Sequence, residues 1–316
     1  MNRILVTGAS GFIGHALVAA FAKEGHSVRA AVRRPPPYSF PATVEVLQHP
    51  GLTEPVDWKP ILHGIDQVVH LAGIAHISSG VASDLYDRVN RIATAQLATA
   101  AAEANVRHFI FCSSLRAQSG PSADHVLTER DQPAPTDAYG RSKLAAERAV
   151  RAAGVPFTVL RPVVLYGPGA KGNVALLARL AALPLPLPLK NFANRRSLLG
   201  IGNFISAVNF VLSTPAALGE TYIVADPGPA PRLSDTIAAL RKATGQTPLL
   251  LPLPPRCVEI PLRTIGGTGL WERFGGELQA DPDKLIAAGW HPAHDTLNGL
   301  AAMAKAARAA GADMPV

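Results

Sequence analysis

Between residues 3 and 161, short runs of β-branched residues alternate with longer alanine-rich stretches in which apolar residues recur every three or four positions. The short runs predict strands buried on both faces, and the longer period predicts amphipathic helices. The predicted strands cover residues 4–7, 28–32, 44–47, 67–71, 108–112 and 157–160, and the predicted helices cover residues 12–23, 82–104 and 138–153. This alternation is typical of βαβ units, so we expect an α/β fold with an open, doubly wound parallel sheet.

The pattern changes after Pro162, because prolines then concentrate in residues 182–188, 226–229 and 249–255. We interpret this second part as a smaller, loop-rich lobe with short helices at residues 203–212 and 234–243. The predicted division is therefore a sheet domain at residues 1–165 and a lobe formed mainly by residues 166–316, of which some segments can return to the sheet.

Composition supports a globular chain of enzyme size, since 48% of the 316 residues are hydrophobic and only 17% are charged. The two cysteines, Cys112 and Cys257, are too few and too far apart for a disulfide framework or a thiolate metal site, and we expect both to be buried thiols. The ten histidines show no ligand spacing, so no metal site is predicted. His70, at a predicted strand end, is interpreted as a packing residue.

The formal charge of +7 comes from scattered arginines, without a basic stripe that alternates with aromatic residues. This pattern does not favour nucleic acid, and phosphate-bearing small molecules explain the excess equally well. The sequence begins directly with a strand and a glycine turn and contains no apolar run of about 18 residues. We therefore expect a cytoplasmic protein without membrane insertion.

A glycine-rich turn follows the first predicted strand and opens the first helix, in the order Thr7-Gly8-Ala9-Ser10-Gly11-Phe12-Ile13-Gly14. In this context Gly8 makes the tight turn, Gly11 lets the backbone approach a phosphate, and Gly14 lets the helix pack closely on the sheet. The backbone amides and the helix dipole would then face a pyrophosphate. The turn predicts a Rossmann-type domain that binds a nicotinamide dinucleotide.

The end of the second predicted strand bears on the choice of cofactor. An acidic residue there would bind the ribose hydroxyls and repel a 2′-phosphate, but this strand ends in Arg33 and Arg34. Two guanidinium groups can make bidentate phosphate contacts, so NADP(H) is favoured over NAD(H). The alternative is that both arginines are ordinary solvated surface residues, which would leave NAD(H) open.

A candidate catalytic group lies at the start of the helix predicted at residues 138–153. Tyr139 and Lys143 are four residues apart and therefore share one face of that helix. A phenol titrates near pH 10 and exchanges protons at neutral pH only if a cation stabilises its phenolate. Ser113 and Ser114 end the strand just before it, where a hydroxyl could hydrogen-bond the reacting oxygen.

The glycine turn, the serine strand end and the Tyr/Lys pair resemble, in this order, the extended short-chain dehydrogenase/reductase family, over nearly the whole chain. The resemblance implies catalytic roles for Ser114, Tyr139 and Lys143. It implies cofactor contacts by Gly8, Ser10, Gly11, Phe12, Ile13, Gly14, Arg33, Arg34, Leu71, Ala72, Gly73, Asn90, Ser113, Tyr139, Lys143 and Pro162. One departure lies at the end of the third strand, where relatives usually carry an acidic residue beside the adenine and this chain has Pro50-Gly51-Leu52. Asp57 is either a substitute for that acid or a plain surface residue.

The resemblance also narrows the reaction. Sugar dehydratases of the family carry an acidic pair after the catalytic hydroxyl residue, whereas this chain has Leu115 and Arg116, so dehydration is disfavoured. Segments around Ser114, residues 166–173 and residues 194–198 resemble a bacterial subgroup acting on UDP-sugars, in which Asn173, Arg195 and Arg196 would contact the substrate. The implied reaction is reduction of a UDP-4-keto-6-deoxy-hexosamine to a UDP-N-acetylquinovosamine type of product.

Two alternatives stay open. A UDP-hexose 4-epimerase would use the same residues and recycle one tightly bound NAD, and a non-catalytic NADP sensor would bind the dinucleotide without turnover. Sensors usually lack the Tyr/Lys pair, which favours an enzyme. Family members commonly form homodimers through helices that correspond to residues 82–104 and 138–153, so we expect a homodimer.

Overall fold

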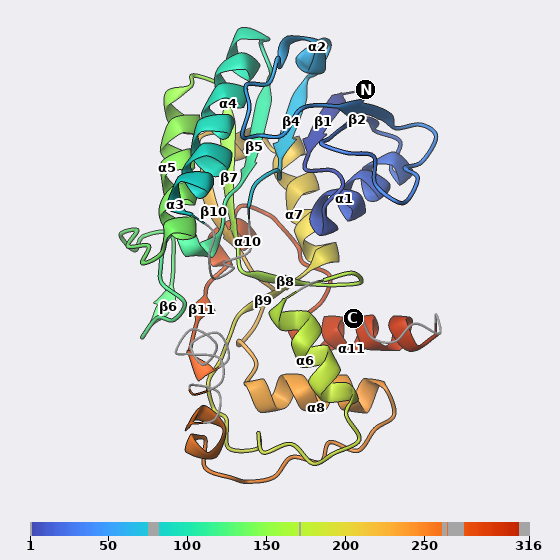
Figure 1. Cartoon of the computed structure of the whole chain (residues 1–316), viewed down its shortest axis with the longest axis vertical. Coiled ribbons are helices and arrows are strands. Elements are labelled where there is room, and N and C mark those ends of the chain that lie inside the picture. The colour runs from blue at the N-terminus through green and yellow to red at the C-terminus, as the bar shows by residue number, and fades with distance from the viewer. Residues whose placement is uncertain (1, 75–81, 171, 261–263, 265–274, 310–316) are drawn as a thin grey trace.

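Within the described residues, seven parallel strands form the central sheet in the order β10-β7-β5-β4-β1-β2-β3 (Figure 1). The computed structural model describes residues 2–74, 82–170, 172–260, 264 and 275–309. The strands are β1 (Arg3–Thr7), β2 (Ser27–Val32), β3 (Glu45–Gln48), β4 (Gln67–His70), β5 (His108–Cys112), β7 (Phe157–Pro162) and β10 (Thr221–Val224). Every neighbouring pair is parallel. The predicted doubly wound parallel sheet is therefore confirmed.

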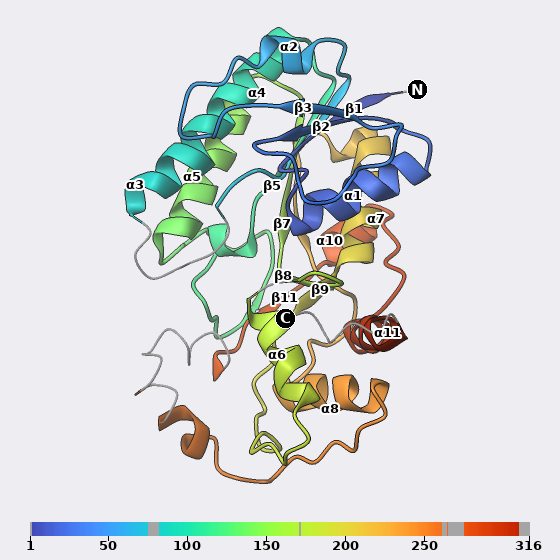
Figure 2. The same cartoon turned by 45° about the vertical axis from the view of Figure 1, so that its right-hand side comes forward.

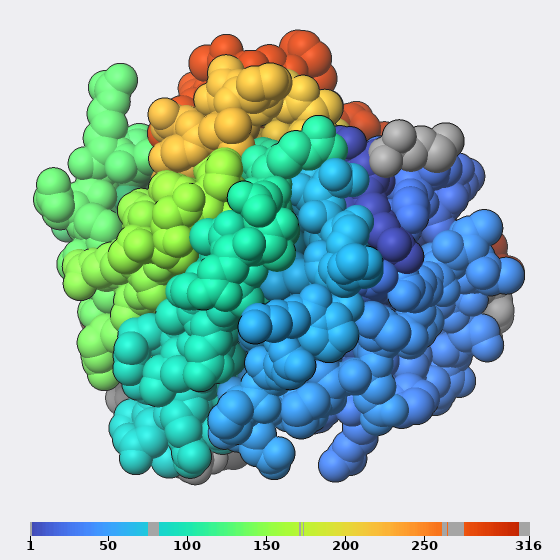
Figure 3. All heavy atoms as spheres, turned by 90° about the horizontal axis from the view of Figure 1, so that it is seen from above, coloured from blue at the N-terminus to red at the C-terminus, as the bar shows by residue number. Residues whose placement is uncertain are grey.

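Helices cover both faces of the sheet. One face carries α1 (Phe12–Lys23) and α7 (Ile201–Ser213), and the other carries α2 (Lys59–Leu62), α4 (Ala93–Glu103) and α5 (Ala138–Ala152). Side chains alternate between the faces along each strand, so Val6 packs with the first layer and Leu5 with the second. In Figure 3, seen from above, α4 and α5 run side by side over one flank of the sheet.

The helix predicted at residues 82–104 forms, but it is not uniform. It consists of α3 (Ser83–Tyr86), a π-helical turn (Asp87–Ile92) and α4. Asn90 lies in the π turn and is 1% exposed. A π turn inserts an extra residue into a helix and often marks a functional site, and it leaves Asn90 facing the next helix, α5.

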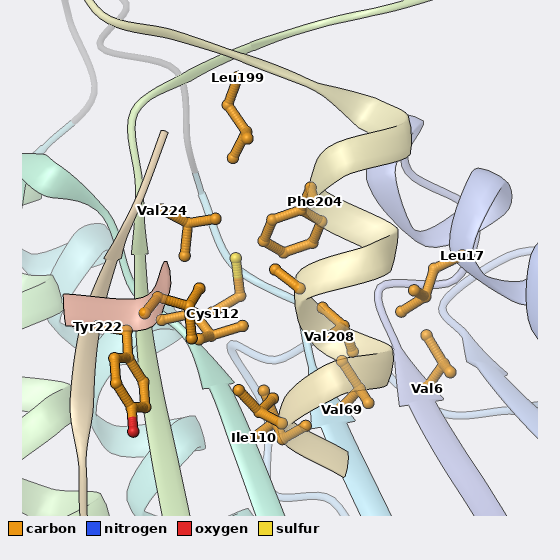
Figure 4. Packing of buried hydrophobic residues seen from close by; sticks show 14 of the residues in the cluster. Val6, Leu17, Val69, Ile110, Cys112, Leu199, Phe204, Val208, Tyr222 and Val224 are labelled. Atoms are coloured by element: carbon orange, nitrogen blue, oxygen red, sulfur yellow. The ribbon is translucent and has the colours of Figure 1, made fainter. Parts of the chain in front are cut away.

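Helix α7 packs on the sheet, although the sequence pattern had predicted it in the lobe. Its buried Phe204 and Val208 lie against strand residues that include Val69 and Ile110 (Figure 4). The chain then adds β10 to the edge of the sheet beside β7. Residues 201–224 thus return to the sheet domain, because the apolar face of α7 is covered only there.

The lobe lies beyond the carboxyl ends of the strands (Figure 2). It contains the paired strands β8 (Val164–Tyr166) with β9 (Leu198–Gly200), β6 (Val126–Leu127) with β11 (Gln279–Ala280), and the helices α6 (Asn173–Ala182), α8 (Leu233–Ala243) and α11 (Thr296–Ala309). Shorter elements include the 3₁₀ turns η2 (Leu115–Ala117) and η3 (Pro215–Ala217), and α10 (Asp283–Ala287), which packs on β10. No helix among the described residues combines the length and apolar composition needed to cross a bilayer.

Asp226, directly after β10, joins the lobe to the sheet. Its buried carboxylate accepts hydrogen bonds from the Tyr166 hydroxyl at 2.8 Å, the Gly200 amide at 2.9 Å, Asn203 Nδ2 at 2.7 Å and the Thr296 hydroxyl at 3.0 Å. Burial raises the pKa of this carboxyl, and the four donors act against that shift. One charged group therefore connects β9, α7 and α11.

The expectation for the cysteines is half right. Cys112 is a buried free thiol at the end of β5, as predicted, but Cys257 is exposed. Cys257 directly follows a proline-rich segment whose residues are all exposed from 251 to 256, so no core is available there to cover the thiol.

Candidate active site

The predicted site residues gather where four parallel strands end side by side. The glycine turn follows β1, Leu71–Gly73 follow β4, Ser113 and Ser114 follow β5, and Pro162 ends β7. Because β7, β5, β4 and β1 are consecutive in the sheet, these segments form one row along its carboxyl edge. Open α/β sheets bind their ligands at this edge.

The glycine turn has no room for larger residues. Gly8 has a φ of +69°, and a β-carbon there would lie 2.8 Å from the Ala72 amide nitrogen. A β-carbon at Gly14 would lie 2.2 Å from the Gly8 carbonyl oxygen. Within the described part of the chain, no side chain accepts a hydrogen bond from the backbone amides at the start of α1, and the first turn of this helix contains no acidic residue. The turn therefore offers a close, uncapped helix N-terminus that fits a pyrophosphate, with Phe12 and Ile13 as its first helical residues.

A chain of hydrogen bonds connects this turn to the helix layer through His70. The Ala72 amide donates to the Thr7 hydroxyl at 3.3 Å, and the Thr7 hydroxyl lies 2.7 Å from His70 Nδ1. His70 Nε2 lies 2.9 Å from the Thr94 hydroxyl, which itself donates to the Asn90 carbonyl at 2.7 Å. Because the Thr94 hydroxyl gives its proton to Asn90, it must accept from His70, so the His70 proton lies on Nε2. His70 Nδ1 is then the acceptor for the Thr7 hydroxyl.

His70 stays neutral in this position. Burial lowers its pKa to about 3, and the nearby Lys143 ammonium acts in the same direction. A protonated imidazole would also lose its acceptor nitrogen and break the bond from Thr7. The prediction of a packing residue is correct in that His70 is fully buried, but it missed that the ring joins β1, β4 and α4.

Asn90 continues the connection to the catalytic helix. Its side chain accepts from the Ile74 amide at 2.8 Å and donates to the Ser142 hydroxyl at 3.0 Å, which in turn donates to the Tyr139 carbonyl at 2.7 Å. A β-carbon at Gly73 would lie 2.9 Å from Asn90 Oδ1. The segment after β4 is thus held against the start of α5.

Tyr139 and Lys143 lie one helical turn apart on α5 and are 8% and 5% exposed. Lys143 Nζ donates to the Cys112 carbonyl at 2.7 Å and lies 4.6 Å from the centroid of the Phe111 ring. Burial raises the pKa of Tyr139 to about 12, and a hydrogen bond with the Ser114 hydroxyl opposes that rise. The phenol therefore holds its proton at neutral pH, ready for donation to an oxygen beside it.

A buried ion pair holds the strand end that carries the two serines. Arg161 Nη2 lies 2.7 Å from a Glu147 oxygen, Arg161 Nε lies 2.9 Å from the other, and the Ser113 hydroxyl donates to Glu147 at 2.6 Å. Glu147 is on α5, four residues after Lys143, and is fully buried. It was missed in the sequence, although its spacing from Lys143 places both on one helix face.

The first turn of α5 is held against η2. Asp137 caps the helix by accepting from the Gly140 amide at 2.6 Å, and its carboxylate also pairs with Arg116. A β-carbon at Gly140 would lie 2.2 Å from the Arg116 carbonyl, so only glycine lets the two turns approach this closely. This contact positions Tyr139 beside Ser114.

The predicted cofactor-selecting arginines lie at the other end of the row. Arg33 and Arg34 are exposed after β2, and the Arg33 carbonyl accepts from Gln48 Nε2 at 3.2 Å. A β-carbon at Gly51 would lie 3.7 Å from Arg33 Cδ, so Arg33 borders the segment where the adenine-side acid is missing. Asp57 is exposed and accepts from the Lys59 amide at 3.1 Å, as a plain surface acid would.

The predicted substrate residues lie in the lobe. Arg196 donates to the carbonyls of Pro121 and Gly276, both at 2.9 Å, and Arg195 donates to the Ala230 carbonyl at 2.7 Å. Burial lowers the pKa of Arg196 to about 10, and the positive charge of Arg116 adds to that effect. Asn173 is the first residue of α6, and its side chain is outside the described part of the structure.

Comparison with known proteins agrees with this architecture. The model of the NAD dependent epimerase/dehydratase family matches residues 4–225. A UDP-glucose 4-epimerase from Vibrio cholerae is 31% identical over 317 residues, covering 96% of this chain and 94% of that protein. A ceramide reductase from Caulobacter vibrioides is 31% identical over 213 residues, which cover 67% of this chain and 61% of that protein. Among solved structures, MoeE5 in complex with UDP-glucose and NAD has a TM-score of 0.77 at 25% identity, covering 98% of this chain and 100% of that one.

Replacing Gly14 with alanine should damage the phosphate turn selectively. The new methyl group would overlap the Gly8 carbonyl and push α1 away from the turn, which costs about 1–3 kcal/mol of overpacking. We expect dinucleotide affinity, measured by isothermal titration calorimetry, to fall by about 10- to 100-fold. The control is Gly202→Ala in α7, where a β-carbon meets open space. Equal affinity for both variants would contradict the role of the turn.

The buried histidines should make the fold sensitive to acid. Between pH 6.5 and pH 3 the unfolded chain binds a proton at His70 that the folded chain refuses, so the free energy of unfolding falls as the pH is lowered. The slope from one such histidine is about 1.4 kcal/mol per pH unit. His108, whose pKa burial lowers to about 4, adds a second contribution.

We therefore expect His70→Asn to flatten the dependence of unfolding free energy on pH between 4 and 6, measured by urea denaturation. The variant should also lose about 1–3 kcal/mol at neutral pH, because Thr7 and Thr94 lose their partner. The change of slope distinguishes titration from a general loss of stability. A slope as steep as that of the wild type would show that His70 is protonated in the folded chain.

Proposed function

The chain belongs to the NAD dependent epimerase/dehydratase family, and we propose that it transfers hydride between a nicotinamide dinucleotide and carbon 4 of a UDP-sugar. The observation that carries this proposal is the buried pair Tyr139 and Lys143, with half-buried Ser114 beside them, in one row with the glycine turn. A proton donor, a cation and an orienting hydroxyl are the groups that carbonyl reduction requires. The V. cholerae relative bears the name of a UDP-sugar enzyme, and MoeE5 was solved with UDP-glucose, which supports this substrate class.

The chain's own residues have separable tasks in this scheme. When bound, the dinucleotide supplies or accepts the hydride. Tyr139 donates its proton to the substrate oxygen, the Ser114 hydroxyl orients that oxygen, and Lys143 stabilises the phenolate that remains. Gly8–Gly14 would hold the pyrophosphate, with Asn90 and residues 71–73 beside the nicotinamide end.

Net reduction of a UDP-4-keto-6-deoxy-hexosamine is the specific reaction that we propose. Net reduction uses Tyr139 as a proton donor, and burial, which raises the pKa of Tyr139 to about 12, keeps that phenol protonated. A net reductase must exchange its cofactor, and exposed Arg33 and Arg34 offer two cations for the 2′-phosphate of NADP(H). NAD(H) is the alternative, and MoeE5 was solved with NAD.

Epimerisation at carbon 4 is the second candidate, favoured by the relative from V. cholerae that covers nearly the full chain. It would use the same three residues in both directions and keep one NAD bound. Dehydration lacks support because Leu115 is apolar and Arg116 is paired with Asp137. A sensor without turnover lacks support because Ser114, Tyr139 and Lys143 are all present.

For substrate binding, we propose that Asn173, Arg195 and Arg196 face the UDP portion, with the lobe as its binding region. The charges support Arg196, because Arg116 lies close enough to lower its pKa. An anion placed between two cations would relieve their repulsion. Guanidinium groups are well suited to bind a diphosphate through bidentate hydrogen bonds.

Two assays in parallel distinguish the candidates. UDP-4-keto-6-deoxy-N-acetylglucosamine is supplied with NADPH or NADH, and absorbance at 340 nm is followed; UDP-glucose and UDP-N-acetylglucosamine are supplied without added cofactor. We expect cofactor oxidation, faster with NADPH. Interconversion of the two C4 epimers without net cofactor change would establish the epimerase instead.

Tyr139→Phe tests the catalytic role of Tyr139 in whichever of the two assays shows activity. Loss of the proton donor should lower turnover by about 10²- to 10⁴-fold and leave dinucleotide affinity within about twofold of the wild type. Ser213→Ala is a suitable control for turnover, because Ser213 is exposed at the end of α7 and its hydroxyl bonds only carbonyls of its own helix. Retained turnover in the phenylalanine variant would remove Tyr139 from the mechanism.

We also propose a homodimer in which α4 and α5 of one protomer pack on the same helices of its partner. These helices lie together on one flank of the sheet (Figure 3), and Ile92 at their edge is 36% exposed. Ile92→Glu should shift the sedimentation coefficient from that of a dimer to that of a monomer, because a carboxylate buried in the interface would lose its hydration without gaining a partner. A wild-type chain that sediments as a monomer at micromolar concentration would contradict this assembly.

A further inference from the structure

Five exposed leucines line the end of the lobe that is farthest from the sheet. Leu183, Leu185, Leu249, Leu251 and Leu253 are between 41% and 59% exposed, and we call them the leucine ridge. They come from two segments, one after α6 and one after α8, which run together along the bottom of Figures 1 and 2. Exposed leucines gathered in this way mark a contact surface more often than scattered ones do.

The two segments are joined through their backbones. The Leu187 amide donates to the Leu249 carbonyl at 2.9 Å, and the Leu251 amide donates to the Leu187 carbonyl at 2.8 Å. Lys190 donates through its amide to the Leu251 carbonyl at 3.2 Å. Leucine alternates with proline over residues 183–189, and Pro252, Pro254 and Pro255 punctuate the second segment; proline has no amide hydrogen to satisfy.

Arg241 holds the ridge from inside. It is 1% exposed, and its guanidinium donates to the carbonyls of Leu183 at 2.9 Å, Leu185 at 2.7 Å and Leu249 at 3.0 Å. It also donates to the Ala181 carbonyl at the end of α6. The carbonyls of three ridge leucines therefore point inward to one cation, and the outer face presents mainly their side chains.

This backbone arrangement matters for the kind of partner. Unsatisfied amide and carbonyl groups are costly in an apolar medium, so a loop can enter a lipid interface only if its backbone is bonded or lacks donors. In the leucine ridge, Arg241 and the backbone bonds between the two segments take up the carbonyls of four of the five leucines, and the prolines bring no amide hydrogens.

Cations outnumber acids in the sequence around the leucine ridge, where Glu259 is the one acid within ten residues of either segment. No aspartate or glutamate occurs between residues 148 and 219 or between residues 236 and 258. The exposed cations nearest to the ridge in sequence are Arg179, Lys190, Lys242 and Arg256. An apolar surface edged by cations complements the acyl and phosphate layers of an anionic bilayer.

We propose that the leucine ridge docks this enzyme peripherally on an anionic membrane surface. The leucine side chains enter the interface between head groups and acyl chains, and the four flanking cations contact the lipid phosphates. A second copy of this chain is a poorer occupant, because two identical ridges would bring their cations together. The inference is independent of which sugar nucleotide the active site accepts.

Flotation with lipid vesicles tests this docking. The full chain is mixed with vesicles of phosphatidylcholine alone or of phosphatidylcholine and phosphatidylglycerol in equal parts, and the floated fraction is measured at low and high salt. We expect binding to the anionic vesicles at least tenfold above that to neutral ones, reduced by salt. Equal binding to both, or none to either, would overturn the proposal.

Two double variants distinguish binding through the leucine ridge from nonspecific hydrophobic binding to vesicles. Leu185→Ser with Leu251→Ser should lower the partition to anionic vesicles at least tenfold, with an unchanged melting temperature because both side chains are exposed. Val46→Ser with Leu218→Ser, which removes two side chains of similar exposure from the sheet domain, should bind as the wild type does. Equal losses in the two variants would overturn the assignment, as would self-association that only the ridge variant abolishes.

Discussion

The close contact between the glycine turn and the end of β4 is the constraint on which the rest of the site depends. Gly8 lies so near the Ala72 amide, and Gly14 so near the Gly8 carbonyl, that a single methyl group at either position would separate them. This contact aligns the end of β1 with the end of β4. The Thr7–His70–Thr94 bonds then extend the same alignment to the helix that carries Asn90.

A second set of buried charges positions the catalytic half. Glu147 on α5 pairs with Arg161 on β7 and accepts from the Ser113 hydroxyl at the end of β5, so the catalytic helix is bonded to two strand ends. A buried pair contributes little to stability compared with apolar residues, but removing one partner leaves an unpaired charge that is expensive. Neutral His70 and cationic Lys143 can share this interior because burial suppresses protonation of the imidazole.

Most of the sheet could be predicted because its signals are local. Short apolar runs bounded by turns gave six strands to within two residues, and the glycine turn and the Tyr139–Lys143 spacing are contiguous motifs. The errors concern contacts between distant segments. The apolar face of α7 covers the sheet because Phe204 packs in one cluster with Val69. The spacing of apolar residues within α7 predicts a helix but does not tell which distant segment the helix covers. Glu147 and Arg161 are 14 residues apart and meet only after β7 has returned beside β5.

The transfer of deuterium to the sugar tests the central claim most directly. The enzyme is given a UDP-4-keto-6-deoxy sugar together with reduced dinucleotide that carries deuterium on the transferring carbon of its nicotinamide. We expect mass spectrometry and NMR to find the label on carbon 4 of the sugar. A dinucleotide that binds at the glycine turn while the ketone stays unreduced, or a label on another carbon, would contradict it.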